Sequence, residues 1–165
     1  MFDKFGEFNN AAELNRAAGA QKAEGDIEAV KLLAKENGID PEDAQDYING
    51  AVEELCTPLT AALGKLEVES EALGLFGIFQ SWKEMLVDEA IKNTDLQENI
   101  RKKGKSLKDA LAAVLKAESK GRKAIPGEIA KAAGIPNNTQ VSTMTAKDQR
   151  KTLIGYYKEA VHVSV

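Results

Sequence analysis

The sequence predicts an all-α fold, a compact bundle of about seven to nine short helices with room for a short C-terminal strand. Aromatic residues make up only 5% of the chain, and Ala and Leu dominate its apolar residues, whereas strands favour β-branched and aromatic side chains. Apolar residues also recur at helical spacing in several segments. Capping residues precede those segments, and glycines follow many of them, as at helix ends.

The first third of the chain carries three helix starts, each marked by a residue whose side chain can accept from a free backbone amide. The third start also has a proline at its first helical position and acids in its first turn, which favours a helix there. The candidate caps are Asn9 or Asn10, Asp26 and Asp40, and the glycines expected to end or break the helices are Gly25, Gly38 and Gly50.

The middle of the chain predicts the core helix. A helical period runs over 52–66, with Pro58 expected either to kink it or to start a new segment. Acidic residues alternate with others over 67–71, which we interpret as a solvated connection. The most apolar stretch, 73–91, is the predicted core helix, and Thr94 is expected to cap the helix after it. The inward face of the core helix is predicted to be Leu75, Ile78, Phe79, Trp82, Met85, Leu86 and Ile91.

A basic elbow follows, over residues 101–108, and leads into the best-defined helix. Ser106 precedes Asp109 by three residues, a short-armed capping box, and Gly121 is the expected stop. The predicted apolar face of this helix is Leu107, Ala110, Leu111, Val114 and Leu115.

The last forty residues contain weaker signals. A short helix is expected between Pro126 and Gly134, and 141–145 can form an extended piece. Thr145 is the expected cap of a final helix, and the tail over 160–165 can be a strand.

Charge divides the chain more sharply than composition does. Residues 1–100 carry 8 Lys or Arg and 21 Asp or Glu, a net charge of −13, whereas residues 101–165 carry 14 and 5, a net charge of +9. We expect a single domain over 1–165, with an acidic helical lobe at 1–100 and a basic helical lobe at 101–165. Such asymmetry indicates a charged partner, or two halves that attract each other.

Sites for chemistry are sparse. One cysteine, Cys56, and one histidine, His162, form neither a disulfide framework nor a metal-binding pattern, so we expect no cofactor or metal. Gly104-Lys105-Ser106 before a helix is a possible anion seat, but it lacks the spacing of a phosphate loop. An enzyme is the weakest hypothesis, and a buried carboxylate or Cys56 open in a cleft would revive it. The absence of a leader pattern and of a long apolar run favours a cytoplasmic protein.

Two charged clusters are the candidate binding residues. The basic cluster can grip phosphates or can be a solvated helix end paired with the acidic half. The acidic cluster can imitate a phosphate backbone or can serve solubility alone. The basic residues are Arg101, Lys102, Lys103, Lys105, Lys108, Arg122 and Lys123. The acidic residues are Glu42, Asp43, Asp46, Glu53, Glu54, Glu67, Glu69 and Glu71.

The chain also carries a set of distinctive motifs, which are Phe2-x-x-Phe5-x-x-Phe8, 14–18, 24–26, 36–40 with 42–44, 53–59, 61–66, 101–107, 134–136 and Tyr156-Tyr157. Together these motifs resemble those of a family of small proteins from mobile elements of gut Firmicutes. The chain departs from the family around 141–147, where a shorter loop is expected. The resemblance implies an anti-CRISPR inhibitor of the type II effector nuclease, and no catalytic residues carry over.

Two binding functions are therefore in view. In the first, a non-enzymatic inhibitor binds a CRISPR effector nuclease with its guide RNA and blocks DNA binding or cleavage. In the second, a nucleic-acid-binding accessory protein of a conjugative element or plasmid grips DNA or RNA through the basic elbow. We expect no membrane partner for either function.

Overall fold

The computed structural model describes residues 2–159. Within this range the chain forms nine helices and one two-stranded antiparallel sheet, and the predicted fold class is confirmed. The elements are α1 (Ala11–Ala23), α2 (Ile27–Glu36), α3 (Pro41–Asn49), α4 (Pro58–Leu73), α5 (Ile78–Lys92), α6 (Thr94–Arg101), α7 (Leu107–Lys120), β1 (Arg122–Ala124), α8 (Gly127–Ala133), β2 (Gln140–Ser142) and α9 (Ala146–Lys158).

Most predicted helix boundaries are confirmed because they depend on local hydrogen bonds. Each of five cap side chains accepts from a backbone amide at the start of its helix. The five are Asn10, Asp26, Asp40, Ser106 and Thr145. The expected extended piece is β2, whereas the tail at 160–165 lies outside the described residues.

Four details of the middle segment differ from expectation. Residues 67–71 are not a connection but the last turns of α4, whose start at Pro58 confirms the second of the two expected alternatives. Asn93, rather than Thr94, caps α6. Ile78 and Ile91 lie at the two ends of α5 and are 51% and 55% exposed, so they are not part of the core face.

Two hydrophobic clusters meet at α4. The first joins α1, α2 and α3 to Leu55, Cys56 and Ala61. The second is built from α4, α5, α6, α7 and α9 around Trp82, with Phe79 packed edge-on to it at 5.5 Å between ring centroids. Packing therefore divides the chain within the first turns of α4, between Ala61 and Ala62, whereas charge divides it near residue 100.

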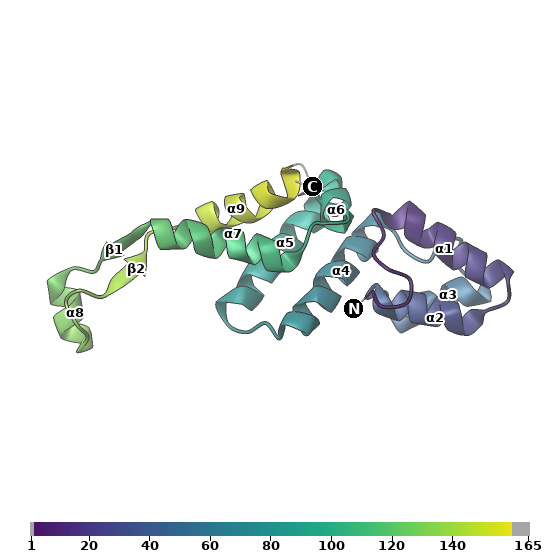
Figure 1. The fold of residues 1–165 in the computed structure, drawn as a ribbon, viewed down its shortest axis with the longest axis horizontal. Coiled ribbons are helices and arrows are strands. Elements are labelled where there is room, and N and C mark those ends of the chain that lie inside the picture. The colour runs from purple at the N-terminus through teal and green to yellow at the C-terminus, as the bar shows by residue number, and fades with distance from the viewer. Residues whose placement is uncertain (1, 160–165) are drawn as a thin grey trace.

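The molecule is elongated, and its two ends are built from different elements (Figure 1). The α1–α3 unit forms one end, the larger bundle forms the middle, and β1, α8 and β2 extend from the bundle at the other end. We call residues 121–145 the arm. No helix within residues 2–159 combines the length and the apolar character needed to cross a membrane.

Candidate interaction surfaces and the buried junction

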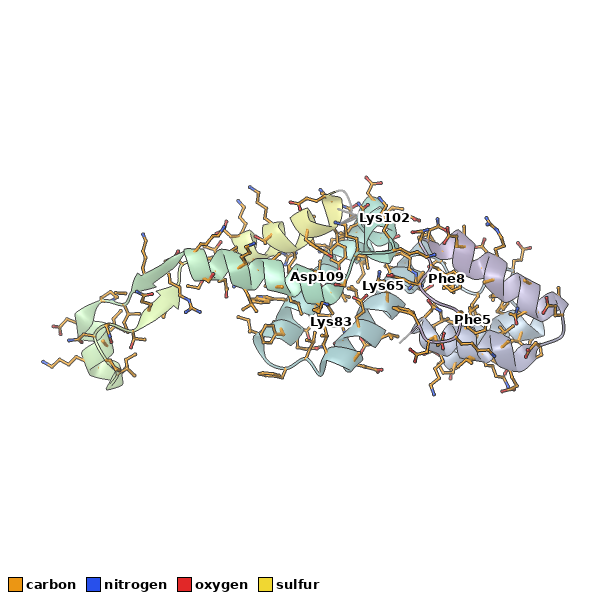
Figure 2. The ribbon with its side chains drawn as sticks, viewed as in Figure 1. Phe5, Phe8, Lys65, Lys83, Lys102 and Asp109 are labelled. Atoms are coloured by element: carbon orange, nitrogen blue, oxygen red, sulfur yellow. The ribbon has the colours of Figure 1, made fainter. Side chains whose placement is uncertain are left out.

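The charge division predicted from the sequence is laid out along the long axis of the molecule. The acidic residues of the first third lie on the α1–α3 unit, at one end. Lysines and arginines concentrate in α7, the arm and α9, toward the other end (Figure 2). The basic elbow, residues 101–108, lies between them, where α6 leads into α7.

The elbow does not present all of its cations to solvent. Arg101 is 1% exposed and Lys105 is 5% exposed, in contrast to the expected surface cluster. The Nζ atom of Lys105 donates to the backbone oxygen of Tyr156 at 2.6 Å and lies over the ring of that tyrosine. Lys102, Lys103 and Lys108 are exposed, as are Arg122 and Lys123 in the arm.

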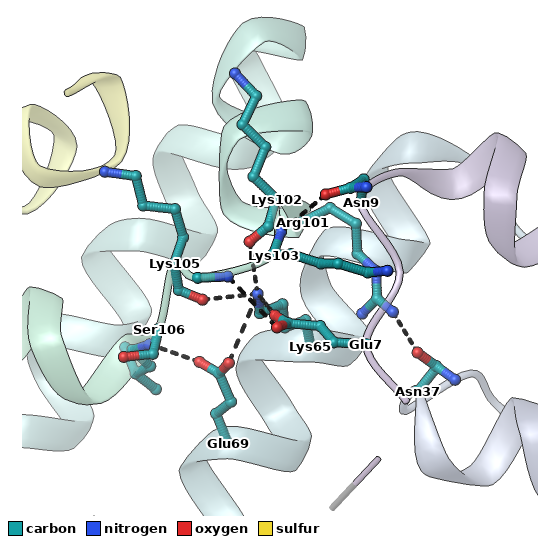
Figure 3. Close-up of polar contacts among 12 residues, drawn as sticks. Glu7, Asn9, Asn37, Lys65, Glu69, Arg101, Lys102, Lys103, Lys105 and Ser106 are labelled. Carbon is teal, nitrogen blue, oxygen red and sulfur yellow. Dashed lines mark hydrogen bonds and ion pairs between the residues drawn. The ribbon is translucent and has the colours of Figure 1, made fainter. Parts of the chain in front are cut away.

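A lysine from the acidic half is buried beneath the elbow (Figure 3). Lys65 of α4 is 0% exposed, and its Nζ atom donates to the backbone oxygens of Lys105 at 2.7 Å and Lys102 at 3.1 Å. It also forms an ion pair with Glu7. Burial lowers the pKa of Lys65, and the hydrogen bond that Lys65 donates to Glu7 opposes that shift. The elbow is therefore held by a cation beneath its carbonyl groups.

The possible anion seat at the start of α7 is filled by a carboxylate of the protein itself. Glu69 of α4 accepts from the backbone amide of Leu107 at 2.5 Å, and its other oxygen lies 3.8 Å from Lys65 Nζ. Glu69 was expected on the acidic surface, but it is 5% exposed. Burial raises its pKa, and the Leu107 amide opposes the shift. A free phosphate would have to displace this carboxylate.

Arg101 joins the two hydrophobic units from the other side of the elbow. Its guanidinium donates to the side-chain oxygen of Asn37, at the end of α2, and faces the ring of Phe2 at 5.6 Å. Burial lowers its pKa, and Glu7 opposes the shift. The Nε and Nη1 atoms have no hydrogen-bond partner among the described residues. These contacts place Arg101 in the interior, where the α1–α3 unit meets the larger bundle.

The acidic cluster is mostly on the surface. Seven of its eight members are exposed, and Glu69 is the exception. Four of them line one open hollow of about 430 Å³ between α3 and the loop that follows it. These four, which we call the acidic rim, are Asp43, Asp46, Glu53 and Glu54. Glu67 lines a second hollow beside α2 and α3, together with Glu71.

Cys56 lies under the acidic rim and is 4% exposed. Burial raises the pKa of its thiol to about 12, so the reactive thiolate is scarce at neutral pH. The backbone amide of Cys56 donates to Asn15 Oδ1 at 3.0 Å, and its Sγ atom lies 3.4 Å from the same oxygen. These contacts are those of a buried structural thiol.

The two features that would favour an enzyme, a buried carboxylate and a cysteine at a hollow, are thus both occupied structurally. Glu69 accepts from the first backbone amide of α7, and Cys56 carries a protonated thiol. Among the residues that the structure describes, no group of three or more His, Cys, Asp and Glu side chains is arranged to hold a metal. His162 lies outside that range.

Sequence reasoning missed Lys65 and the structural role of Glu69. A signal was present, because both residues fall on the apolar stripe of α4 defined by Ala61, Ala62 and Leu66. Opposite charges four residues apart on such a stripe indicate a buried pair.

No family model, characterised protein or solved structure matches this chain. The functional interpretation therefore depends on the motif resemblance and on the charges and surfaces of the chain itself.

Proposed function

We propose that the protein is a non-enzymatic inhibitor that binds a CRISPR effector nuclease and blocks its DNA binding or cleavage. The observation that carries this proposal is the acidic rim, four exposed carboxylates around one hollow at the end opposite the basic arm. The sequence resemblance supplies the class of partner.

The physical basis is competition for a basic groove. Such nucleases hold nucleic acid in a positively charged channel through its backbone rather than its sequence. Carboxylates spaced along a rigid surface can occupy that channel because they complement the same lysines and arginines. Two rim residues, Asp43 and Asp46, belong to α3, and Glu53 and Glu54 to the loop after it, so a folded unit fixes their positions.

The basic elbow offers fewer cations for binding than its sequence predicts. Its exposed cations are Lys102, Lys103 and Lys108, which can contact the guide or an acidic edge of the nuclease. The alternative function, an accessory protein that grips DNA through the elbow, loses two of its expected contacts because Arg101 and Lys105 are buried. The elbow therefore supports a secondary contact better than a main one.

The test is a cleavage assay with purified nuclease, guide RNA and target DNA, together with gel filtration of the mixture. We expect the wild-type protein to form a complex and to slow cleavage. A rim variant with Asp43→Asn, Asp46→Asn, Glu53→Gln and Glu54→Gln is expected to lose at least tenfold in inhibition, and the loss should shrink as salt rises.

The matched control neutralises four exposed acids away from the rim and is expected to inhibit like the wild type. Its substitutions are Glu24→Gln, Glu84→Gln, Asp88→Asn and Asp95→Asn. Undiminished cleavage at large molar excess, with no complex on the column, would remove the nuclease as the partner. Equal loss in the rim and control variants would remove the rim as the binding surface.

A further inference from the structure

The arm is an outlying element whose strands are open to solvent. The chain leaves α7 at Gly121 and returns at Thr143, where the Thr143 amide donates to the Gly121 oxygen at 3.1 Å. Between these points β1 and β2 pair antiparallel, and α8 lies at the far end (Figure 1). A short two-stranded ribbon with both faces accessible is the result.

The register of the ribbon sorts its side chains by chemistry. Arg122 is paired with Ser142, and Ala124 with Gln140, so these four side chains share one face. Lys123 and Val141 are paired on the opposite face. The first face thus carries Arg, Gln and Ser, the residue types that bond to base edges in the DNA major groove.

The surroundings of this face are basic. Residues 120–147 carry five Lys or Arg and one acid, a net charge of +4 in a chain whose total is −4. Among the ion pairs found within residues 2–159, none involves a cation of this segment. The five cations are exposed: Lys120, Arg122, Lys123, Lys131 and Lys147.

Stability of the bundle does not account for the arm. Neither hydrophobic cluster contains a residue of 121–145, and Ala130 is the single buried residue in that range. Larger apolar side chains of the arm remain exposed, with Ile129 at 58% and Val141 at 49%. An isolated two-stranded ribbon is marginal in water, so an exposed one with a polar face suits a binding role.

We propose that the arm binds double-stranded DNA, with its lysines on the phosphates and the Arg122, Gln140 and Ser142 face toward the major groove. The major groove of B-DNA, about 12 Å wide, admits a two-stranded ribbon. The deep, narrow major groove of A-form RNA does not admit side chains in this way. This binding does not depend on the proposed nuclease partner, because it requires only the arm.

The experiment is fluorescence anisotropy of a labelled duplex of about 25 base pairs, titrated with the full-length protein at several salt concentrations. An arm variant, Arg122→Ala with Lys123→Ala and Lys131→Ala, is expected to bind at least tenfold more weakly at low salt. Because each lost phosphate contact removes about 0.9 from the slope of log affinity against log salt, the loss of the two lysines should make the slope shallower by about 2.

The control removes the same charge from exposed sites outside the arm, by Lys35→Ala, Lys92→Ala and Lys158→Ala. It is expected to retain most of the wild-type affinity and the wild-type slope. A second variant, Gln140→Ala with Ser142→Ala, keeps the charge and is expected to weaken binding several-fold without changing the salt slope.

Three results would overturn the proposal: no duplex binding at low salt, equal loss in the arm and control variants, or a preference for single-stranded DNA or duplex RNA. An unaffected Gln140 and Ser142 variant would overturn the orientation toward the groove. None of these results depends on a nuclease, so the failure of this proposal and the failure of the proposed inhibition are separate outcomes.

Discussion

The backbone of Gly64 in α4 lies directly against that of Gly38, the residue that follows the C-cap of α2. A Cβ atom added to Gly64 would lie 2.3 Å from the carbonyl oxygen of Asn37, and one added to Gly38 would lie 2.3 Å from the carbonyl oxygen of Gly64. Gly38 also has φ of +66°. This close approach is where the α1–α3 unit joins the larger bundle.

Gly64→Ala should therefore destabilise the protein. The added methyl group gains helix propensity worth about 1 kcal/mol, but the contact with the Asn37 oxygen forces the two backbones apart. We expect a net loss of about 1–3 kcal/mol in the free energy of unfolding, measured by urea denaturation. Gly155→Ala is the matched control, because an added Cβ there meets no atom within 4 Å. A Gly64→Ala protein as stable as the control would contradict the close approach.

Lys65→Met should cost more than any substitution of an exposed lysine. The change leaves Glu69 without its cation and leaves the Lys102 and Lys105 oxygens without the Nζ donor. Breaking a buried charge pair from one side typically costs about 3–5 kcal/mol.

The measurement is urea unfolding beside Lys31→Met, which removes an exposed pair with Glu28 and should cost less than about 1 kcal/mol. Equal losses in the two variants would show that Lys65 is not the cation that holds the elbow.

Features set by neighbours in sequence were predictable, and features set by distant contacts were not. Ser106 bonds to the amide of Asp109, three residues away, so its sequence context is enough to identify the cap. The burial of Arg101 depends on Asn37, and the burial of Lys105 on Tyr156. A run of basic residues gives no sign of which members the fold encloses.

The surface sites divide in the same way. The acidic rim was within the predicted acidic cluster because its residues are close in sequence and exposed. Only one strand of the ribbon, β2, was predicted, since β1 spans three residues without an alternating apolar pattern. Its pairing with β2 is set by the connection over 125–139, which includes α8, and no local signal specifies that register.

Cys56 should make the protein less stable at alkaline pH. Its folded-state pKa of about 12 exceeds the unfolded value of about 8.5, so above pH 8.5 the unfolded chain holds fewer protons than the folded one. The stabilising contribution is complete below that pH and is lost as pH rises toward 12, by at most about 1.4 kcal/mol per unit.

The measurement is urea unfolding of wild type and Cys56→Ala from pH 7 to 10.5 under reducing conditions. The difference between the two free energies should be constant below pH 8 and should shift in favour of the alanine variant above pH 9. Parallel curves across the whole range, or native Cys56 reacting with a thiol reagent as fast as a free cysteine, would contradict this burial.

Removal of residues 122–142, which form most of the arm, should leave the larger bundle folded. Gly121 and Thr143 are already in contact, since both the amide and the hydroxyl of Thr143 donate to the Gly121 oxygen, at 3.1 Å and 2.6 Å. Replacing residues 122–142 with Gly-Ser-Gly therefore closes a short gap, and α7 still packs on α9 through Val114, Leu153 and Tyr157. We expect a free energy of unfolding within about 1 kcal/mol of the full chain, because loop length changes closure entropy only slowly. Circular dichroism during urea denaturation measures this, and the shortened protein should lose duplex binding while keeping the acidic rim. A shortened chain that unfolds without a cooperative transition would show that the arm supports the fold.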